Sequence, residues 1–434
     1  MPSSWFTPCS SLFSKEESPL YLITNARIIT EEGVLSGYDL LIQGDRIGRI
    51  APHGVIAVDT QTEVLDAAGG YLSPGFIDIH SDYIEHMAAP RPTSLMDFRL
   101  SLRETEKELL THGITTMFHS LSIFRGSEYK YRPIREPENV RKLLELIEES
   151  HTSQHLVRHR FHARFEIDNL LEVDNLRNYI AEKKVHLVSF MDHTPGQGQY
   201  RDLEIYKATV KGYDDMTDEG IDELIRKHQS KEKMTIEGIR EIAGLAREAG
   251  IAVASHDDDS LDKLELVQGF GATISEFPIT LEIARRAKQQ GMYTVAGAPN
   301  VILGGSHSGN LSAAEAIQEK SIDILCSDYY PAALLHAVFY LVDRCGQELA
   351  DMFRLVTLHP ARAVNLDHEI GSVREGKKAD LILIEKIDGD FPVITAVFVD
   401  GKLIQRTHYR DHEGGKGIEQ SAHDRTLVQN VHSV

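Results

Sequence analysis

Eight short apolar segments recur along the middle of this chain, and a loop or a stretch with helical patterning follows each one. One such stretch places Ile236, Ile239, Ala243 and Ala246 on a single helical face, and Gly250 ends it. Strands that alternate with helices are typical of a parallel sheet covered by helices. The eight segments are Gly75–Ile79, Ile114–Phe118, Phe161–Phe165, Val185–Met191, Ile251–Ala254, Ala272–Ser275, Met292–Ala296 and Ile322–Cys326.

Eight such repeats over residues 73–365 predict a TIM-like (β/α)8 barrel in the α/β class. The longest interval between consecutive predicted strands, residues 194–233, is interpreted as an insertion. A doubly wound open sheet is the alternative fold. It has less support because no Gly-x-Gly-x-x-Gly sequence follows the first strand. A chain of 434 residues can hold a barrel of this size together with an appendage.

The two ends of the chain have a different pattern from the middle. Residues 20–72 and 366–407 contain short β-type runs separated by glycine turns, including the hairpin signal Asp400-Gly401. These runs predict one small β-sandwich built from both chain ends. Residues 1–19 are rich in serine and proline and predict a loosely ordered leader, and the polar residues 408–434 predict a mobile tail.

The composition excludes several classes of function. The formal net charge is −20, which disfavours binding to nucleic acid or to an anionic membrane surface. No apolar run is long enough to span a membrane, and three cysteines give no disulfide framework. Since residues 1–19 lack the pattern of a secretory signal, we expect a cytoplasmic protein. The oligomeric state is left open, and a homo-oligomer is compatible with the sequence.

Polar residues stand where seven of the eight predicted strands end. The carboxyl ends of barrel strands face one common site, so these side chains are expected to converge. His80 and Asp82 lie two residues apart, which places both on the same side of a strand. The strand-end residues are His80-Ser81-Asp82, His119, Glu166, Asp192-His193, His256 with Asp257-Asp258-Asp259, Glu276 and Asp328.

Converging histidines and carboxylates predict a catalytic divalent metal site with one or two ions. Imidazole and carboxylate ligands suit zinc, and manganese or iron are alternatives. A single histidine is more often an ordinary hydrogen-bonded residue than a ligand, but that explanation does not account for polar residues at seven strand ends. The predicted ligands are His80, Asp82, Glu166, His193, His256 and Asp328.

Several motifs resemble known proteins. Residues 73–80, Ser-Pro-Gly-Phe-Ile-Asp-Ile-His, resemble the first-strand signature of the amidohydrolase superfamily. Residues 371–381 and His359-Pro360-Ala361 resemble the segment by which those enzymes re-enter their β-sandwich, so the similarity extends over roughly residues 20–405. The resemblance implies a metal-dependent hydrolase. Members often have a carboxylated lysine that bridges two metals, and Glu166 is interpreted as its substitute because no lysine ends a strand here.

A narrower resemblance is to the α-D-ribose 1-methylphosphonate 5-triphosphate diphosphatases of the carbon–phosphorus lyase pathway. It implies hydrolysis of a triphosphate ester to a 5-phosphate and pyrophosphate during phosphonate breakdown. The motifs that carry it are His80-Ser81-Asp82, Glu85-His86, Pro90-Arg91-Pro92, Ser255-His256-Asp257-Asp258, Ser275-Glu276-Phe277-Pro278, Gly297-Ala298-Pro299-Asn300, Gly304–Asn310 and Ser327–Pro331.

The expected chemistry begins with a water molecule whose pKa the metal lowers toward about 7. Asp328 is expected to orient that water and accept its proton, with a plain helix N-cap as the alternative role. His119 is also expected in the catalytic set. An anionic small-molecule substrate would need a local group of bases, for which Arg91 and Arg132 are the candidates. The Gly-rich segment with Ser306 and His307 either cradles phosphate or is a loop without a ligand.

Two other classes of function compete with the phosphate anhydride hydrolase. One is a metal-dependent hydrolase of C–N bonds, such as a deaminase or cyclic amidase, which is the commoner use of the superfamily. The other is a non-catalytic protein on the same barrel. The intact set His80, Asp82, His256 and Asp328 argues against the non-catalytic class, and the basic loops favour the anhydride hydrolase.

Overall fold

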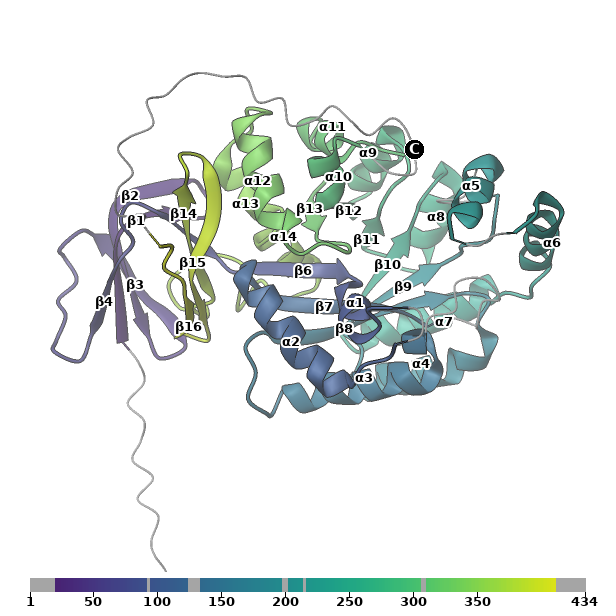
Figure 1. Ribbon diagram of the computed structural model, residues 1–434, viewed down its shortest axis with the longest axis horizontal. Helices are drawn as coiled ribbons and strands as arrows, with labels where there is room; N and C mark the ends of the chain where they lie inside the picture. Colours follow the sequence, from purple (N-terminus) through teal and green to yellow (C-terminus); the bar gives the residue numbers. More distant parts are fainter. Residues whose placement is uncertain are drawn as a thin grey trace, which may run out of the picture.

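Eight parallel strands form the central sheet of the computed structural model, which describes residues 20–91, 94–123, 133–196, 202–213, 216–305 and 310–410. The strands pair in the order in which they occur in the chain, as Figure 1 shows. All eight predicted strands are present. They are β6 Phe76–Ser81, β7 Ile114–Ile123, β8 Arg158–Glu166, β9 Leu187–Met191, β10 Ala252–His256, β11 Ile274–Glu276, β12 Tyr293–Gly297 and β13 Ile324–Cys326.

The sheet closes at the carboxyl ends of its first and last strands. Ser81 and Asp328 form a parallel bridge, in which the Asp82 N–H donates to the Asp328 carbonyl at 2.8 Å and the Asp328 N–H donates to the His80 carbonyl at 3.1 Å. The predicted (β/α)8 barrel is therefore confirmed, and the open doubly wound sheet is excluded. Closure at this point also brings the end of β6 next to the residues after β13.

Helices cover the outside of the barrel, and six of those described begin at a side-chain cap. Thr235, for example, caps α7 by accepting a hydrogen bond from the Gly238 N–H. The helices are α1 Tyr83–Ala88, α2 Phe98–Thr111, α3 Pro137–Ser150, α4 Val173–Ala181, α5 Leu203–Tyr213, α6 Asp218–Gln229, α7 Ile236–Glu248, α8 Leu261–Gly269, α9 Leu281–Gln289, α10 Ala298–Leu303, α11 Ala313–Gln318, α12 Ala333–Asp343, α13 Leu349–Arg354 and α14 Leu358–Ala363, with short 3₁₀ turns at Pro133–Arg135 and Leu170–Glu172.

Side chains along the barrel strands point alternately toward the surrounding helices and into the barrel interior. In β8, Phe161, Ala163 and Phe165 are buried in the apolar layer that includes helix α3. Inside the barrel, a second apolar cluster contains residues from every strand except β8, among them Ile79, Phe118 and Ile324. The interior is thus a packed core rather than a pore, and polar side chains gather toward the carboxyl ends of the strands.

The chain ends build a second sheet beside the barrel (Figure 1). Tyr21 of β1 contacts Phe398 of β15 with ring centroids 5.3 Å apart, although β5 and β14 lie between these strands in the sheet. The sheet therefore folds over on itself around one apolar core, which confirms the predicted sandwich. Its strands are β1 Leu20–Ile29, β2 Val34–Gln43, β3 Arg46–Pro52, β4 Glu63–Asp66, β5 Tyr71–Pro74, β14 Leu381–Ile387, β15 Phe391–Val399 and β16 Lys402–Arg406.

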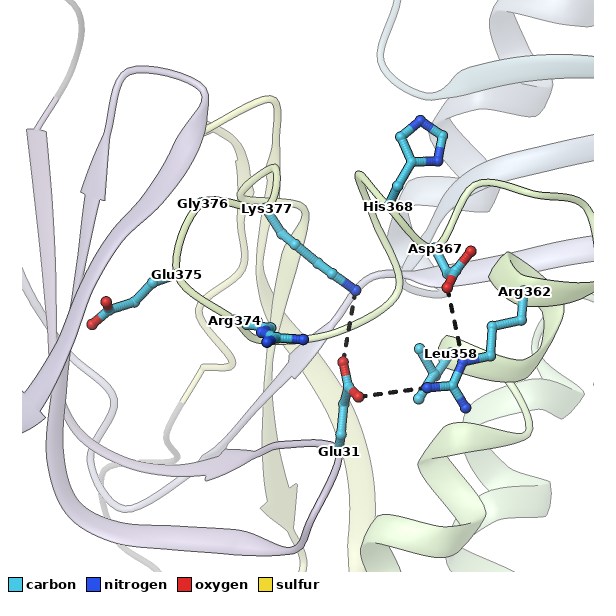
Figure 2. Close-up of a pocket in the computed structure, with 9 residues that line it drawn as sticks. All are labelled: Glu31, Leu358, Arg362, Asp367, His368, Arg374, Glu375, Gly376 and Lys377. Atoms are coloured by element: carbon cyan, nitrogen blue, oxygen red, sulfur yellow. Dashed lines mark ion pairs between the residues drawn. The ribbon is translucent and has the colours of Figure 1, made fainter.

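Ion pairs join the sandwich to the barrel. Arg158 of β8 pairs with Asp380 and Asp400 at the two ends of the β14–β15 hairpin. A polar pocket of about 470 Å³ opens at the same junction, where Glu31 lies 3.7 Å from both Lys377 and Arg362 (Figure 2). The pocket is lined by charges that largely neutralise one another, so we interpret it as part of the junction.

Helices α5 and α6 lie within the predicted insertion and have a small apolar core of their own, which includes Tyr206 and Ile225. No helix in the described part of the chain is long and apolar enough to cross a membrane. The predicted leader, residues 1–19, and most of the predicted tail, residues 411–434, lie outside the described residues.

Candidate active site

Three histidines from different strands meet above the barrel core. His80 is on β6, His256 ends β10, and His193 follows β9 by two residues. The His80 and His256 ring centroids are 5.4 Å apart, and those of His193 and His256 are 5.9 Å apart. The strand ends thus bring together three of the predicted metal ligands.

A carboxylate lies beside the Nδ1 atom of each of these rings. His80 Nδ1 is 2.8 Å from Glu276 Oε1, and His193 Nδ1 is 2.5 Å from Glu166 Oε1. His256 Nδ1 is 2.9 Å from Asp257 Oδ2, a close electrostatic contact that is not aligned as a hydrogen bond. Each carboxylate favours the proton on Nδ1 and leaves Nε2 as the ligating atom, which is the usual arrangement around histidines that bind metal.

Glu166 contacts His193 through Oε1, and its assignment as a metal ligand stays a prediction. Burial alone would raise the pKa of Glu166, but the His193 imidazole holds that pKa below its usual value. Burial acts in the opposite direction on His193, and the Glu166 carboxylate outweighs it, so the pKa of His193 is raised. In this structure Glu166 is the residue that orients His193.

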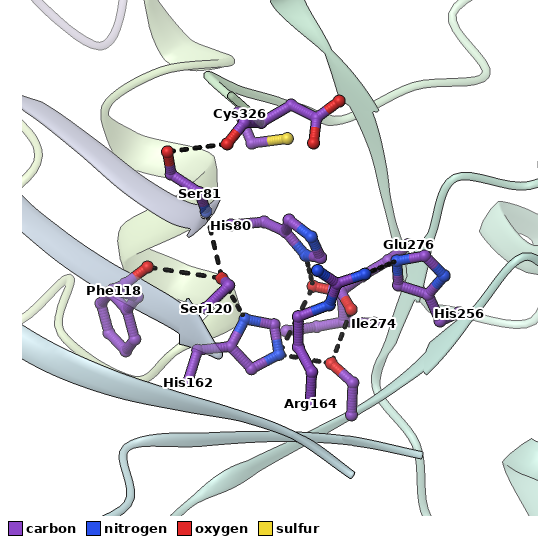
Figure 3. Close-up of polar contacts among 12 residues, drawn as sticks. His80, Ser81, Phe118, Ser120, His162, Arg164, His256, Ile274, Glu276 and Cys326 are labelled. Atoms are coloured by element: carbon purple, nitrogen blue, oxygen red, sulfur yellow. Dashed lines mark hydrogen bonds and ion pairs between the residues drawn. The ribbon is translucent and has the colours of Figure 1, made fainter. Parts of the chain in front are cut away.

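A series of hydrogen bonds links Ser81, the residue after His80, to Glu276, the carboxylate that contacts His80. Figure 3 shows part of this series. The Ser81 N–H donates to Ser120 Oγ at 3.0 Å, and Ser120 Oγ lies 2.9 Å from His162 Nδ1. The chain continues from His162 Nε2 to Ser189, whose hydroxyl donates to Glu276 Oε2 at 2.6 Å. Since both ring nitrogens of His162 are occupied, His162 serves as support for the site and is not a free ligand, although it lies close to His80 and Glu276.

Asp328 stands two residues beyond β13, opposite Asp82. Burial, reinforced by the negative charge of Asp82, raises the pKa of Asp328 to about 7. A carboxyl group with a pKa near neutrality is well matched to accepting a proton from water. The backbone hydrogen bonds that close the barrel hold Asp328 at the end of β6, next to His80 and Asp82.

The backbone is strained at several of these strand ends. Asp257, Phe277 and Asp328 have φ angles of 53°, 54° and 59°, in the left-handed region that side chains larger than glycine rarely adopt. They follow the ends of β10, β11 and β13 respectively. Strain of this kind costs about 1–3 kcal/mol at each residue and gathers at functional sites.

His119 does not join the site. Its ring stacks on His159, with Nε2 2.8 Å from His159 Nδ1, and His159 in turn lies 3.8 Å from Glu106 of α2. Adjacent residues of a strand face opposite ways, so while Ser120 points into the barrel, His119 points toward the helices. The catalytic assignment of His119 is therefore not kept, and we interpret it as a buried structural residue.

Of the residues predicted to bind the substrate, Arg91 lies in the described part of the chain. Arg91 is exposed in a turn closed by the Ser94 N–H. Arg132, Ser306 and His307 lie outside the described residues.

Sequence reasoning missed His162 and Arg164, and it did not give Glu276 and Asp257 their positions beside histidines. His162, Arg164 and Glu166 occupy every second position of β8, and the residues between them, Ala163 and Phe165, pack against helices. That alternation was the available signal, because it places all three polar residues on the interior face. The pairing of each histidine with a particular carboxylate has no counterpart in the sequence pattern.

Comparison with known proteins agrees with this geometry. The model of the Amidohydrolase family matches residues 71–404. The chain belongs to the amidohydrolase family. The similarity inferred from the motifs is thereby confirmed, and so is the class of enzyme, a metal-dependent hydrolase.

Relatives differ in how much of the chain they match. The α-D-ribose 1-methylphosphonate 5-triphosphate diphosphatase of Escherichia coli (strain K12) is 34% identical over 387 residues, which is 88% of this chain and 100% of that protein. An adenine deaminase of Ruegeria sp. (strain TM1040) is 26% identical over 376 residues, which is 81% of this chain and 51% of the relative.

Solved structures support the fold alone. The N-acetylglucosamine-6-phosphate deacetylase of Pasteurella multocida has a TM-score of 0.59 at 16% identity, covering 89% of this chain and 100% of that one. The ochratoxinase of A. niger has a TM-score of 0.61 at 15% identity, covering 90% and 96%.

Proposed function

We propose that this amidohydrolase is a diphosphatase that converts α-D-ribose 1-methylphosphonate 5-triphosphate to the 5-phosphate and pyrophosphate. The observation that carries the proposal is the similarity to the E. coli diphosphatase along that protein's whole length. We further propose phosphonate breakdown in the cytoplasm as the setting and zinc as the metal, with manganese or iron as alternatives.

The donor set fits a divalent metal. His80, His193 and His256 would hold it through Nε2, with Asp82 and Asp328 as the neighbouring carboxylates. For His256 this requires that the Arg164 guanidinium, 3.5 Å from Nε2 in this structure, move aside. When bound, the metal supplies hydroxide from water at neutral pH and polarises the phosphoryl oxygen. Glu276, Glu166 and Asp257 would keep the three imidazoles in the tautomer that ligates.

Asp328 is the proposed general base. The water oxygen attacks the phosphorus atom nearest the sugar, and the water proton passes to the Asp328 carboxylate. The bond from that phosphorus to the bridging oxygen breaks, and pyrophosphate leaves with the electron pair. The raised pKa of Asp328 supports this role because the carboxyl can both accept and release a proton near pH 7.

Hydrolysis of a C–N bond remains a second candidate, and the similarity to the Ruegeria adenine deaminase favours it. The same histidines and the same base would serve that reaction. The two candidates differ in the charge of the substrate and in the group that leaves, so a product assay separates them.

The test is to incubate the metal-loaded protein with the ribose triphosphate and, separately, with adenine. We expect release of pyrophosphate from the first and no ammonia from the second. The Asp328→Asn variant is the control for contaminating phosphatases. Ammonia release without pyrophosphate release would overturn the proposal in favour of the deaminase.

A further inference from the structure

Arg164 projects into the candidate site from the middle of strand β8. It lies between His162 and Glu166 on the interior face of the strand. One guanidinium nitrogen is 3.5 Å from His256 Nε2, and Nε is 3.3 Å from Met191 Sδ. Figure 3 shows the guanidinium beside His256 and Glu276.

In the described part of the chain, no carboxylate lies within ion-pair distance of Arg164. Glu166 and Glu276, which border the same space, are hydrogen-bonded to His193 and His80. Glu166 and Asp328 act on the charge of Arg164 only from beyond contact distance. A half-buried guanidinium without a contacting counter-ion favours the binding of an anion beside it. Its polar contacts here, a thioether sulfur and an imidazole nitrogen, carry no negative charge.

Other basic residues around the barrel mouth are already engaged. Arg135 donates two hydrogen bonds to Glu85, at 2.7 and 2.9 Å. Lys231 pairs with Asp168 at 2.9 Å, and Lys233 pairs with Asp192 at 2.7 Å. Lys263 donates to two backbone carbonyls and lies 3.7 Å from Asp258. Among these bases, Arg164 is the one whose charge is available to a ligand.

We propose that Arg164 binds a phosphate group of the substrate next to the three histidines and thereby selects phosphorylated substrates over uncharged ones. The inference deepens the proposed function and rests on it. A guanidinium presents two parallel N–H groups that match two phosphate oxygens, which an ammonium group does not. The site then recognises charge from inside the barrel, independently of the loops that follow the strands.

The experiment measures binding of inorganic pyrophosphate to the metal-loaded protein by isothermal titration calorimetry, with metal content determined on every sample. Arg164→Met removes the charge and keeps a side chain of similar length. Arg164→Lys keeps the charge but lacks the two parallel N–H groups of the guanidinium. Arg240→Met, on the exposed surface of α7, is the matched control for net charge. Binding of adenine is measured in parallel as the uncharged probe.

We expect Arg164→Met to weaken pyrophosphate binding about ten- to a hundredfold, the usual effect of losing a charge-assisted hydrogen bond. Arg164→Lys should fall between Arg164→Met and wild type, and Arg240→Met should match wild type. Metal content should stay unchanged, which a loss of fold would not allow. For the triphosphate substrate, KM should rise far more than kcat falls in Arg164→Met.

Two results would overturn the assignment of Arg164. One is pyrophosphate binding by Arg164→Met as tight as that of wild type, and the other is a wild type that binds no pyrophosphate. Failure of the proposed function is a separate result. If wild type binds pyrophosphate through Arg164 but releases none from the ribose triphosphate, the anion site stands and the diphosphatase reaction does not.

Discussion

Asp328 combines three properties that seldom meet in one aspartate. It is half-buried near another acid, its backbone is in a strained conformation, and its own main chain closes the barrel. Burial and the Asp82 charge bring the pKa of Asp328 close to neutrality. A side chain fixed in this way needs little reorganisation when it accepts a proton.

Replacing Asp328 by asparagine tests its role as the base. The amide has the same size but cannot take up a proton, so kcat should fall about 10²–10⁴-fold. Metal content and thermal stability should stay close to those of wild type. Turnover of Asp328→Asn within a few-fold of wild type, with metal bound, would assign the base to another residue.

Glu276 provides a second test at the residue scale, because it accepts hydrogen bonds from both His80 and Ser189. Glu276→Gln keeps the shape but removes the charge that favours the proton on His80 Nδ1. We expect metal affinity to weaken about 10–100-fold, the usual effect of losing a carboxylate behind a metal-binding histidine. Competition with a chromogenic chelator measures it, and the exposed Glu282→Gln on α9 is the control. Equal affinities in the two variants would mean that Glu276 does not orient a ligand.

At the scale of elements, the barrel strands were predictable because each is a short apolar run that leads into helical patterning. The role of a residue was harder to predict where it depends on whether the side chain faces the barrel interior or the surrounding helices. His119 ends the predicted second strand, yet β7 continues to Ile123 and turns His119 toward α2. The pairing register of β6 against β7 shifts between Asp78 and Ser81. The direction of the side chains at the end of β6 therefore does not follow from the two-residue alternation of a regular strand.

The turn between β15 and β16 shows a constraint that the sequence signal did not reveal. Asp400-Gly401 was recognised as a hairpin signal, but the structure also packs Gly401 against the backbone of another hairpin. A Cβ atom on Gly401 would stand 1.9 Å from the Gly44 carbonyl oxygen. The φ angle of Gly401 is 73°, which already favours glycine.

Gly401→Ala is therefore expected to destabilise the protein by about 3 kcal/mol or more, because backbone atoms have to move in addition to the strain at φ. Gly389→Ala is the matched control. It lies in the β14–β15 turn with a φ of 93° and open space around it, so its cost should be only about 1–2 kcal/mol. Thermal unfolding of both variants compares them, and a similar loss in each would show that the Gly44 contact does not matter.

At the scale of the whole molecule, buried histidines make folding sensitive to acid. Burial holds the pKa of His119 well below its usual value, and the pKa of His159 is also lowered. Burial, together with the Arg160 charge, lowers the pKa of His186 to about 2. In the unfolded chain these groups titrate near 6.5. Below that pH the unfolded state takes up more protons than the folded state, so stability falls as the pH falls.

Asp78 and Asp328, whose pKa values are raised to about 7, act in the opposite direction. Because the histidines with a lowered pKa are more numerous, we expect the melting temperature to decline from pH 7 to pH 5. Each such histidine contributes up to about 1.4 kcal/mol for every pH unit below its unfolded pKa. His186→Gln removes one titrating group and should reduce the slope, whichever way it changes stability at pH 7. Melting curves of wild type and variant across this pH range give both slopes. Identical slopes would show that His186 does not contribute.

The sandwich built from both chain ends has a consequence for synthesis on the ribosome. Leu72 of β5 pairs with Leu383 of β14, a residue made about 310 positions later. At about 5–20 residues per second, translation leaves β5 without this partner for roughly 15–60 s. During that interval the edge of β5 is open to pairing with other chains. The nascent chain can therefore aggregate through this edge until its last strands have been synthesised. Efficient expression then requires that the edge be shielded during that time.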